Sequence, residues 1–219
     1  MDELARLLSA RHMVRRYTDE PVAEDLLQRL LDLARRAPSA GNTQPWSFLV
    51  LRDDDVDRYW ATTMPAPEAR SRFRWQGLLA APVLVVPYVC PDAYADRYGE
   101  ADKAGTGLGA GTDAWPVPYW WVDGGAVVQN LLLLATAAGL GACLFGQFDH
   151  EDAVRAAFGV PEDQRAVGTI ALGWPAPDEP GRSAGRPRPA LDDVLHHGSW
   201  AVSSSGDDAG SWQVWSRQT

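Results

Sequence analysis

The chain has 219 residues, 46% of them hydrophobic, and a formal net charge of -9 at pH 7. This length and composition are enough to bury a substantial core and suggest one globular domain. The negative charge argues against non-specific nucleic-acid binding, which depends on clustered Lys and Arg.

The first part of the chain predicts two helices and a strand. Residues 4–8 keep leucines at helical spacing, and residues 22–37 have the apolar stripe of an amphipathic helix. Pro38 ends that helix, because a residue before proline avoids the helical region. The sequence "WSFLVL" at 46–51 then indicates a buried strand. The short connection, "APSAGNTQPW" at 37–46, holds two prolines, several polar side chains and a tryptophan.

The middle of the chain predicts further helices and a second strand. Residues 54–80 look helical in two pieces broken near Pro65, and residues 82–89 form an apolar strand pattern. Pro87 within that strand favours an edge or a bulge, because proline has no N–H to donate to a neighbouring strand. Residues 91–121 show no regular periodicity and are rich in glycine and aromatic residues. A segment of this length is typical of a functional lid or a mobile loop.

The longest apolar run, residues 126–144, approaches the length of a membrane span but contains the polar Gln129 and the helix-ending Gly139. A buried central helix over 124–138, followed by a strand, is the better interpretation. Asp123 is the expected N-cap of this helix.

The last part of the chain predicts one more helix and a third clear strand. Asp149 is expected to cap a helix that ends at Gly159, and residues 166–174 form the strand. A proline-rich stretch and a brief helix follow. These elements predict an α+β fold with a small sheet flanked by helices, in one domain over 1–199 with a C-terminal tail over 200–219.

The two cysteines, Cys90 and Cys143, lie far apart in strand-like apolar surroundings. They suggest reduced core thiols rather than a disulfide framework. The N-terminus shows no secretory signal pattern. We therefore expect a cytoplasmic protein.

Motifs for self-contained catalysis are missing from the sequence. The four histidines form no H-E-x-x-H motif, neither cysteine has a metal-ligand partner at the usual spacing, and no G-x-S-x-G occurs. The run "GTGLGAG" at 105–111 lacks the spacing of a dinucleotide fingerprint. No metal site is predicted, and chemistry carried by a cofactor is favoured.

Arginines gather near both ends of this acidic chain. The planar guanidinium suits phosphate or carboxylate, so the two clusters are candidates for one small anionic ligand. Solvated surface charge is the alternative for either cluster alone. The clusters are Arg11, Arg15 and Arg16 near the start, and Arg182, Arg186 and Arg188 near the end.

Three segments together resemble the nitroreductase-like FMN-dependent flavoproteins. They are "RHMVRRYTDEPV" at 11–22, "APSAGNTQPWSFLVL" at 37–51 and "AAGLGACLFGQFD" at 137–149. The resemblance covers roughly residues 4–197. It implies a nitroreductase-like fold with a mixed or antiparallel sheet, an intertwined homodimer with two equivalent FMN sites at the subunit interface, each lined by both chains, and NAD(P)H as electron donor.

The resemblance also implies which residues hold FMN. Arg11 and Arg15 would bind the phosphate together with Arg186 and Arg188, and the loop at 38–42 would reach the flavin of the other subunit. The Gly146 N–H would lie close to flavin N5, the hydride-accepting nitrogen, and no side chain need be catalytic. The alternative is that glycine at position 146 is needed only for the geometry of a turn. The full implied set is Arg11, His12, Met13, Arg15, Pro38, Ser39, Ala40, Asn42, Leu144, Phe145, Gly146, Gln147, Arg186 and Arg188.

Two features are individual to this chain. Met13 stands where the family commonly has a serine, which removes a hydroxyl near the flavin. The chain also has ten tryptophans, several of them in the segment 91–121. Aromatic rings there could stack a flat substrate or fill the dimer interface. The predicted substrate pocket consists of Trp115, Tyr119, Trp120 and Trp121.

Three hypotheses for function follow. In the first, NAD(P)H reduces FMN and leaves, and a small electron-poor acceptor such as a nitroaromatic or a quinone takes the electrons. In the second, the flavin serves a dehydrogenase, oxidase or dehalogenase that acts on one metabolite. In the third, the protein binds flavin with little turnover. No nucleic acid or membrane is an expected partner.

Overall fold

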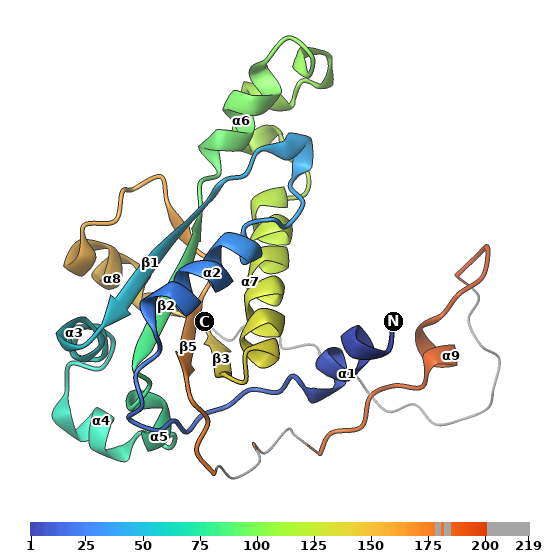
Figure 1. Ribbon diagram of the computed structural model, residues 1–219. Helices are drawn as coiled ribbons and strands as arrows, with labels where there is room; N and C mark the ends of the chain where they lie inside the picture. Colours follow the sequence, from blue (N-terminus) through green and yellow to red (C-terminus); the bar gives the residue numbers. More distant parts are fainter. Residues whose placement is uncertain (178–180, 182–184, 201–219) are drawn as a thin grey trace, which may run out of the picture. The chain divides into compact units, whose positions relative to one another are not determined.

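The computed structural model describes residues 1–177, 181 and 185–200 (Figure 1). The chain divides into two compact units, Met1–Asp178 and Glu179–Thr219, and each is described by itself. The second unit contributes one short helix, α9 (Leu191–Val194). The predicted domain boundary at residue 199 stays a prediction.

A five-stranded antiparallel sheet is the centre of the first unit (Figure 1). Its order confirms an α+β fold with an open sheet. Along the main path the strands are β1 (Trp46–Arg52), β2 (Val83–Val89), β5 (Thr169–Gly173) and β3 (Gly141–Phe145), and the short β4 (Arg165–Ala166) pairs with β2.

Helices cover both faces of this sheet, because successive side chains of a strand point to opposite faces. In β2, Val83 and Val85 pack into the core under α2 (Glu24–Ala34) and α7 (Tyr119–Ala137). Leu84 and Val86 pack into the core on the other face. The helices of that second face are α3 (Asp54–Thr63), α5 (Gln76–Leu79) and α8 (Glu151–Phe158).

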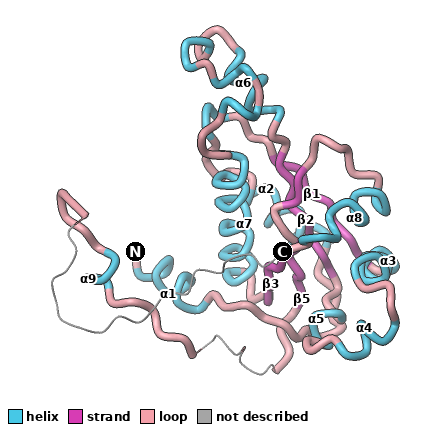
Figure 2. The backbone as a smooth tube through the Cα atoms, turned by 180° about the vertical axis from the view of Figure 1, so that it is seen from behind, coloured by secondary structure: helices cyan, strands magenta, loops and turns pink. Residues whose placement is uncertain are grey.

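The remaining helices of the unit lie at its margins. Figures 1 and 2 both place α6 beyond the end of β2, beside the N-terminal end of α7. Short 3-10 turns at Ala104–Thr106, Leu108–Ala110 and Thr112–Ala114 link α6 to α7. These marginal helices are α1 (Asp2–Ala10), α4 (Pro67–Arg72) and α6 (Asp92–Gly99).

Pro87 lies in an interior strand, so the edge-strand interpretation is wrong. On one side β2 pairs with β1, and on the other it pairs first with β5 and then with β4. Pro87 stands where the pairing passes from β5 to β4, and its carbonyl accepts the Val167 N–H at 2.9 Å. The strand predicted over 166–174 is therefore interrupted at the place where proline has no N–H to donate.

The C-terminal ends of two helices were predicted correctly, and their N-caps were not. Gly139 (φ 78°) and Gly159 (φ 65°) follow α7 and α8 in the left-handed conformation, as the sequence predicted. The predicted N-caps are wrong: α7 begins earlier, at Tyr119, so Asp123 lies inside it, and Asp149 belongs to a 3-10 turn before α8. Within the described ranges, no helix is both long and apolar enough to cross a membrane.

Candidate active site

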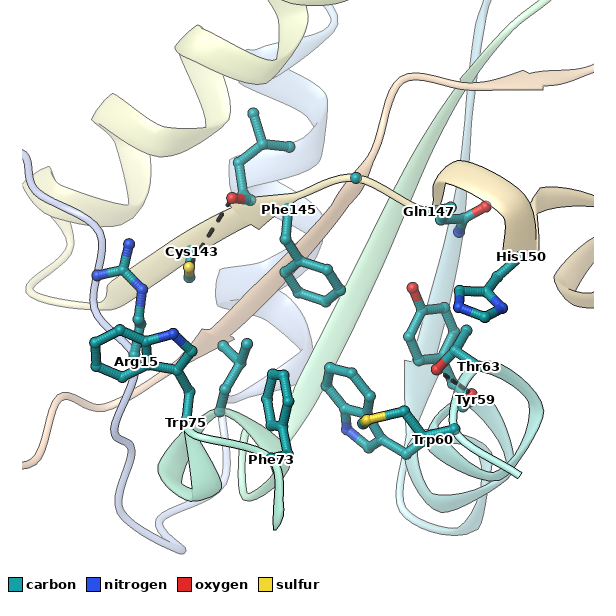
Figure 3. A pocket seen from close by; sticks show the side chains of 14 residues that line it. Arg15, Tyr59, Trp60, Thr63, Phe73, Trp75, Cys143, Phe145, Gln147 and His150 are labelled. Carbon is teal, nitrogen blue, oxygen red and sulfur yellow. Dashed lines mark hydrogen bonds between the residues drawn. The ribbon is translucent and has the colours of Figure 1, made fainter. Parts of the chain in front are cut away.

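A pocket of about 320 Å³ opens at the C-terminal end of β3, on the face covered by α3 (Figure 3). Three parts of the chain line it: the end of β3 with the following turn, the aromatic face of α3, and the segment around α5. A fourth contribution is Arg15, from the N-terminal segment. Its lining includes Arg15, Tyr59, Trp60, Phe73, Trp75, Phe145, Gly146, Gln147 and His150.

Aromatic rings make most of the pocket wall. Phe145 stacks on Trp60 with ring centroids 5.5 Å apart and planes at 17°. Phe73 packs against Trp60 at 6.3 Å, and Arg15 lies over the Trp75 ring at 4.8 Å. The pocket therefore combines a flat apolar wall with a cation at one end, which suits a flat aromatic ligand that carries polar or negative groups at an edge.

A buried polar network lies behind the turn at Gln147. The Tyr59 hydroxyl and the Thr169 hydroxyl are 2.7 Å apart, and Gln147 Nε2 donates to Thr169 Oγ1 at 3.1 Å. Gln147 Oε1 and the Tyr88 hydroxyl are buried with no hydrogen-bond partner in the described part of the chain. Burial raises the pKa of Tyr59 and raises the pKa of Tyr88 to about 12. Both phenols are therefore neutral at physiological pH.

The outer edge of β3 presents a row of backbone groups that the N-terminal segment covers only in part. Val14 N–H donates to the Ala142 carbonyl at 2.9 Å, and Leu144 N–H points to Met13 Sδ at 3.4 Å. Alternate N–H groups of a strand point to the same side, so the next one in this row belongs to Gly146. Among the described residues the structure gives the Gly146 N–H no partner.

The N-terminal basic residues differ in their surroundings. Arg11 is partly buried, and its Nη1 is buried without a hydrogen-bond partner among the described residues. Arg15 lines the pocket and donates from Nη1 to the Met13 carbonyl at 3.3 Å. His12 is exposed, with Nδ1 2.9 Å from the Ala10 carbonyl oxygen. A bound anion would accept a hydrogen bond from this Arg11 nitrogen.

The C-terminal basic residues belong to the second unit. Arg186 and Arg188 are both exposed there. Arg182 and the tail from residue 201 lie outside the described residues. The expectation that Arg186 and Arg188 join Arg11 stays a prediction.

The loop at 38–42 does not line this pocket. Its Ser39 Oγ accepts the Gln44 N–H at 2.9 Å, and Asn42 Oδ1 accepts from Gln44 Nε2 at 3.2 Å. Ala40 N–H donates to Asp123 Oδ2 at 2.8 Å. Pro38 is exposed, and so is Asn42, which has a positive φ of 57°. The loop is therefore a tightly bonded turn whose outer surface is free within this chain.

The four aromatic residues predicted for the substrate pocket divide into two pairs. Trp115 and Trp120 are buried with Tyr94 in a cluster of their own. Tyr119 is 42% exposed and Trp121 is 38% exposed. None of the four lines the pocket beside β3. Of these four described residues, Tyr119 and Trp121 are the two whose rings are open to solvent.

The sequence analysis missed most of the pocket wall. Tyr59 and Trp60 were recognised only as part of a helical stretch, and Phe73 and Trp75 were not singled out. Their signal was the density of aromatic residues in a segment broken by prolines. No local pattern indicated that this segment would pack against the end of β3.

The comparison with known families decides the classification. The sequence profile described as the Nitroreductase family matches residues 8–174. The chain belongs to the nitroreductase family. The match covers the whole sheet and every residue of the pocket, and it makes this nitroreductase-family protein an oxidoreductase.

Two curated relatives illustrate the range of the family. The NADH dehydrogenase of Thermus thermophilus is 34% identical over 181 residues, covering 76% of this chain and 83% of the relative. The 5,6-dimethylbenzimidazole synthase of Rhodospirillum rubrum is 31% identical over 210 residues, covering 87% of this chain and 93% of the relative.

Solved structures share the fold. A nitroreductase-like family protein from Bacillus cereus has a TM-score of 0.66 at 21% identity, covering 89% of this chain and 95% of that one. A Desulfovibrio desulfuricans protein solved in complex with FMN has a TM-score of 0.61 at 23% identity, covering 90% of this chain and 98% of that one.

Proposed function

We propose that this protein is an FMN-dependent oxidoreductase in which NAD(P)H reduces the flavin and a small electron-poor acceptor, such as a nitroaromatic or a quinone, reoxidises it. The observation that carries the proposal is the Gly146 N–H, which has no partner among the described residues, in the lining of an aromatic pocket that also contains Arg15. The FMN complex of the Desulfovibrio protein and the NADH dehydrogenase name of the Thermus relative support it.

The residues present fit FMN. The isoalloxazine is a flat ring system with hydrogen-bonding groups along one edge, and the pocket offers the stacked Phe145 and Trp60 with Arg15 at one end. FMN also carries a phosphate, and Arg11 Nη1 is a buried donor with no acceptor in the part of the chain that the structure describes. A donor left in this state costs free energy that an anionic oxygen recovers.

The chain's own groups would bind and orient, while bound flavin would supply the transfer of hydride and electrons. The Gly146 N–H would direct the positive end of its dipole toward the nitrogen where negative charge develops. Tyr59, a neutral phenol in the pocket lining, would add no charge beside the ring. The aromatic wall would keep water from that face of the ligand.

A second copy of the chain would complete the site. The loop at 38–42 and the exposed rings of Tyr119 and Trp121 would cover the flavin held by the partner, and Arg186 and Arg188 would join Arg11 at the phosphate. The apolar face for this homodimer would include Leu4, Leu8 and Leu33, which are 52%, 47% and 37% exposed.

Subunit mixing tests this arrangement. Dimers formed from one Arg11→Ala subunit and one Asn42→Ala subunit would have one site with both defects and one intact site. We expect each mixed dimer to bind about one FMN tightly, whereas dimers with the same substitution in both subunits have two defective sites. Mixed dimers that bind no FMN tightly would contradict a site built from two chains.

The visible absorption spectrum of the purified protein tests the main proposal. We expect flavin bands that bleach when NADH or NADPH is added without oxygen, and that return with a nitroaromatic or quinone acceptor. Steady-state kinetics should follow a ping-pong pattern. An absence of flavin bands even after FMN is added would contradict the proposal, and kinetics that require both substrates bound together would contradict the alternating scheme.

A flavin enzyme acting on one metabolite is the second candidate. The Rhodospirillum relative, named as a biosynthetic enzyme and matched over 93% of its length, favours it. Fast flavin reduction by a single metabolite with slow NADH oxidation would support this candidate, and broad nitroarene reduction would not. Ordinary turnover with several acceptors would exclude the third hypothesis, a binding module with little turnover.

A further inference from the structure

We propose that Tyr94, Arg97 and Asp123 form a brace that holds the loop at 39–42 in the shape it presents to the flavin, so that the three are positioning residues for cofactor binding. This inference rests on the proposed function. It assigns a role to the segment between β2 and α7, which was expected from the sequence to be a lid or a mobile loop.

The first contact of the brace is a buried carboxylate. Asp123 is only 7% exposed, and its Oδ2 accepts the Ala40 N–H at 2.8 Å and the Tyr94 hydroxyl at 2.6 Å. Burial of a carboxylate is costly unless donors satisfy it, so these two bonds belong together. Asp123 therefore joins α7, α6 and the loop through a single oxygen atom.

The second contact is made by Arg97 at the end of α6. Its Nε donates to the Gly41 carbonyl at 2.9 Å. Its Nη1 and Nη2 donate to the two carboxylate oxygens of Asp102 at 2.8 and 2.9 Å. The bidentate pair fixes the plane of the guanidinium, and so aims Nε at the loop.

Packing closes the remaining space between the loop and α6. A Cβ atom at Gly41 would lie 2.8 Å from Cε2 of Tyr98, and Gly41 has φ of 62°. Tyr98 in turn packs edge-on against Trp115 at 4.7 Å, and both Tyr98 and Ala40 pack against the buried cluster to which Trp115 belongs. Tight space and positive φ therefore both favour glycine at this position.

The loop has a conformation that needs such support. Asn42 and Gln44 have positive φ values of 57° and 53°, which are uncommon for residues other than glycine. Backbones of this kind persist only where the surroundings hold them. With the Ala40 N–H bonded to Asp123, the Ser39 and Gly41 N–H groups are left without partners among the described residues. A loop held in this shape before the ligand arrives binds with a smaller ordering cost.

Hydrogen exchange of the Ala40 amide in the flavin-free protein tests the brace itself. We expect Asp123→Ala and Tyr94→Phe to accelerate exchange at Ala40 by tenfold or more, with little change at Val127 within α7. Asp96→Ala is the matched control, because Asp96 is an exposed neighbour of Arg97 on the same helix and forms no side-chain hydrogen bond or ion pair with the described residues. Unchanged exchange at Ala40 in both variants would overturn the inference.

FMN titration of the same proteins tests the role of the brace. We expect Arg97→Ala and Asp123→Ala to weaken FMN binding by about tenfold or more, Arg97→Lys to recover part of the loss, and Asp96→Ala to bind normally. If Asp123→Ala does not fold, Tyr94→Phe keeps the ring and removes only the hydroxyl. Faster exchange at Ala40 with unchanged FMN affinity would overturn the inference and leave the proposed function intact. Failure of the unaltered protein to bind FMN would overturn both.

Discussion

Replacing Arg11 by alanine should change the flavin-free protein and the flavin complex in opposite directions. Arg11 Nη1 is buried without a partner among the described residues, and such a donor typically costs about 1–3 kcal/mol. The flavin-free variant should therefore be as stable as the unaltered protein or more stable. A gain of about 1 kcal/mol would raise Tm by roughly 2–4 °C for a chain of this size.

FMN binding should weaken in the same variant. Loss of a charge-assisted hydrogen bond to a phosphate costs about 1.5–3 kcal/mol, which is roughly a 10- to 150-fold increase in Kd. Thermal unfolding without flavin and fluorescence titration with FMN measure the two effects separately. The control is Arg16→Ala, because Arg16 is an exposed arginine of the same segment. A lower flavin-free Tm together with an unchanged Kd would refute the reasoning.

Three further predictions concern charge and pH. Arg186→Ala should weaken FMN retention if the second arginine cluster reaches the phosphate, and an unchanged dissociation rate would count against that role. Burial raises the pKa of Tyr88 to about 12, so the folded state holds the proton longer than the unfolded state and stability should fall between about pH 10 and 12. The loss should be about 1–2 kcal/mol after allowance for solvent screening, and Tyr88→Phe should remove it from the alkaline limb of a pH-stability curve. At Glu151 burial opposes ionisation, but Arg165 and the Ala166 N–H outweigh it and lower the pKa of the carboxyl from its ordinary value. Ionised Glu151 should therefore stabilise the fold at pH values above its unfolded pKa, and this stabilisation should be lost as the pH falls through its folded pKa. In Glu151→Gln the free energy of unfolding should fall less steeply as the pH is lowered.

Local patterns in the sequence predicted the elements well and their partners poorly. Gly139 and Gly159 end helices through backbone conformations that a glycine signals by itself. The strands β1, β2 and β5 were each visible as apolar runs, but the pairing of β2 with β1 and β5 was not, because pairing depends on residues far apart in the sequence.

Asp123 illustrates the limit most clearly. An aspartate just before an apolar helical run is a normal N-cap signal, and the local pattern could support no other interpretation. In the folded chain its partners are Ala40 and Tyr94, which lie 83 and 29 residues away in the sequence. An aspartate that makes a tertiary contact can therefore match the sequence pattern of an N-cap.

The strand order supports the proposal that two chains build the flavin site. The loop at 38–42 leads into β1, and Gly146 follows β3, which lies at the opposite end of the strand order β1-β2-β5-β3. Three strand spacings of about 4.8 Å separate the two edges by roughly 14 Å. One ring system could not readily be held by both edges of the same sheet, whereas the loop of a second copy could approach the end of β3 that the N-terminal segment leaves uncovered. The Gly146 N–H is open on that edge, and the brace keeps the loop in shape without any contact to the pocket of its own chain.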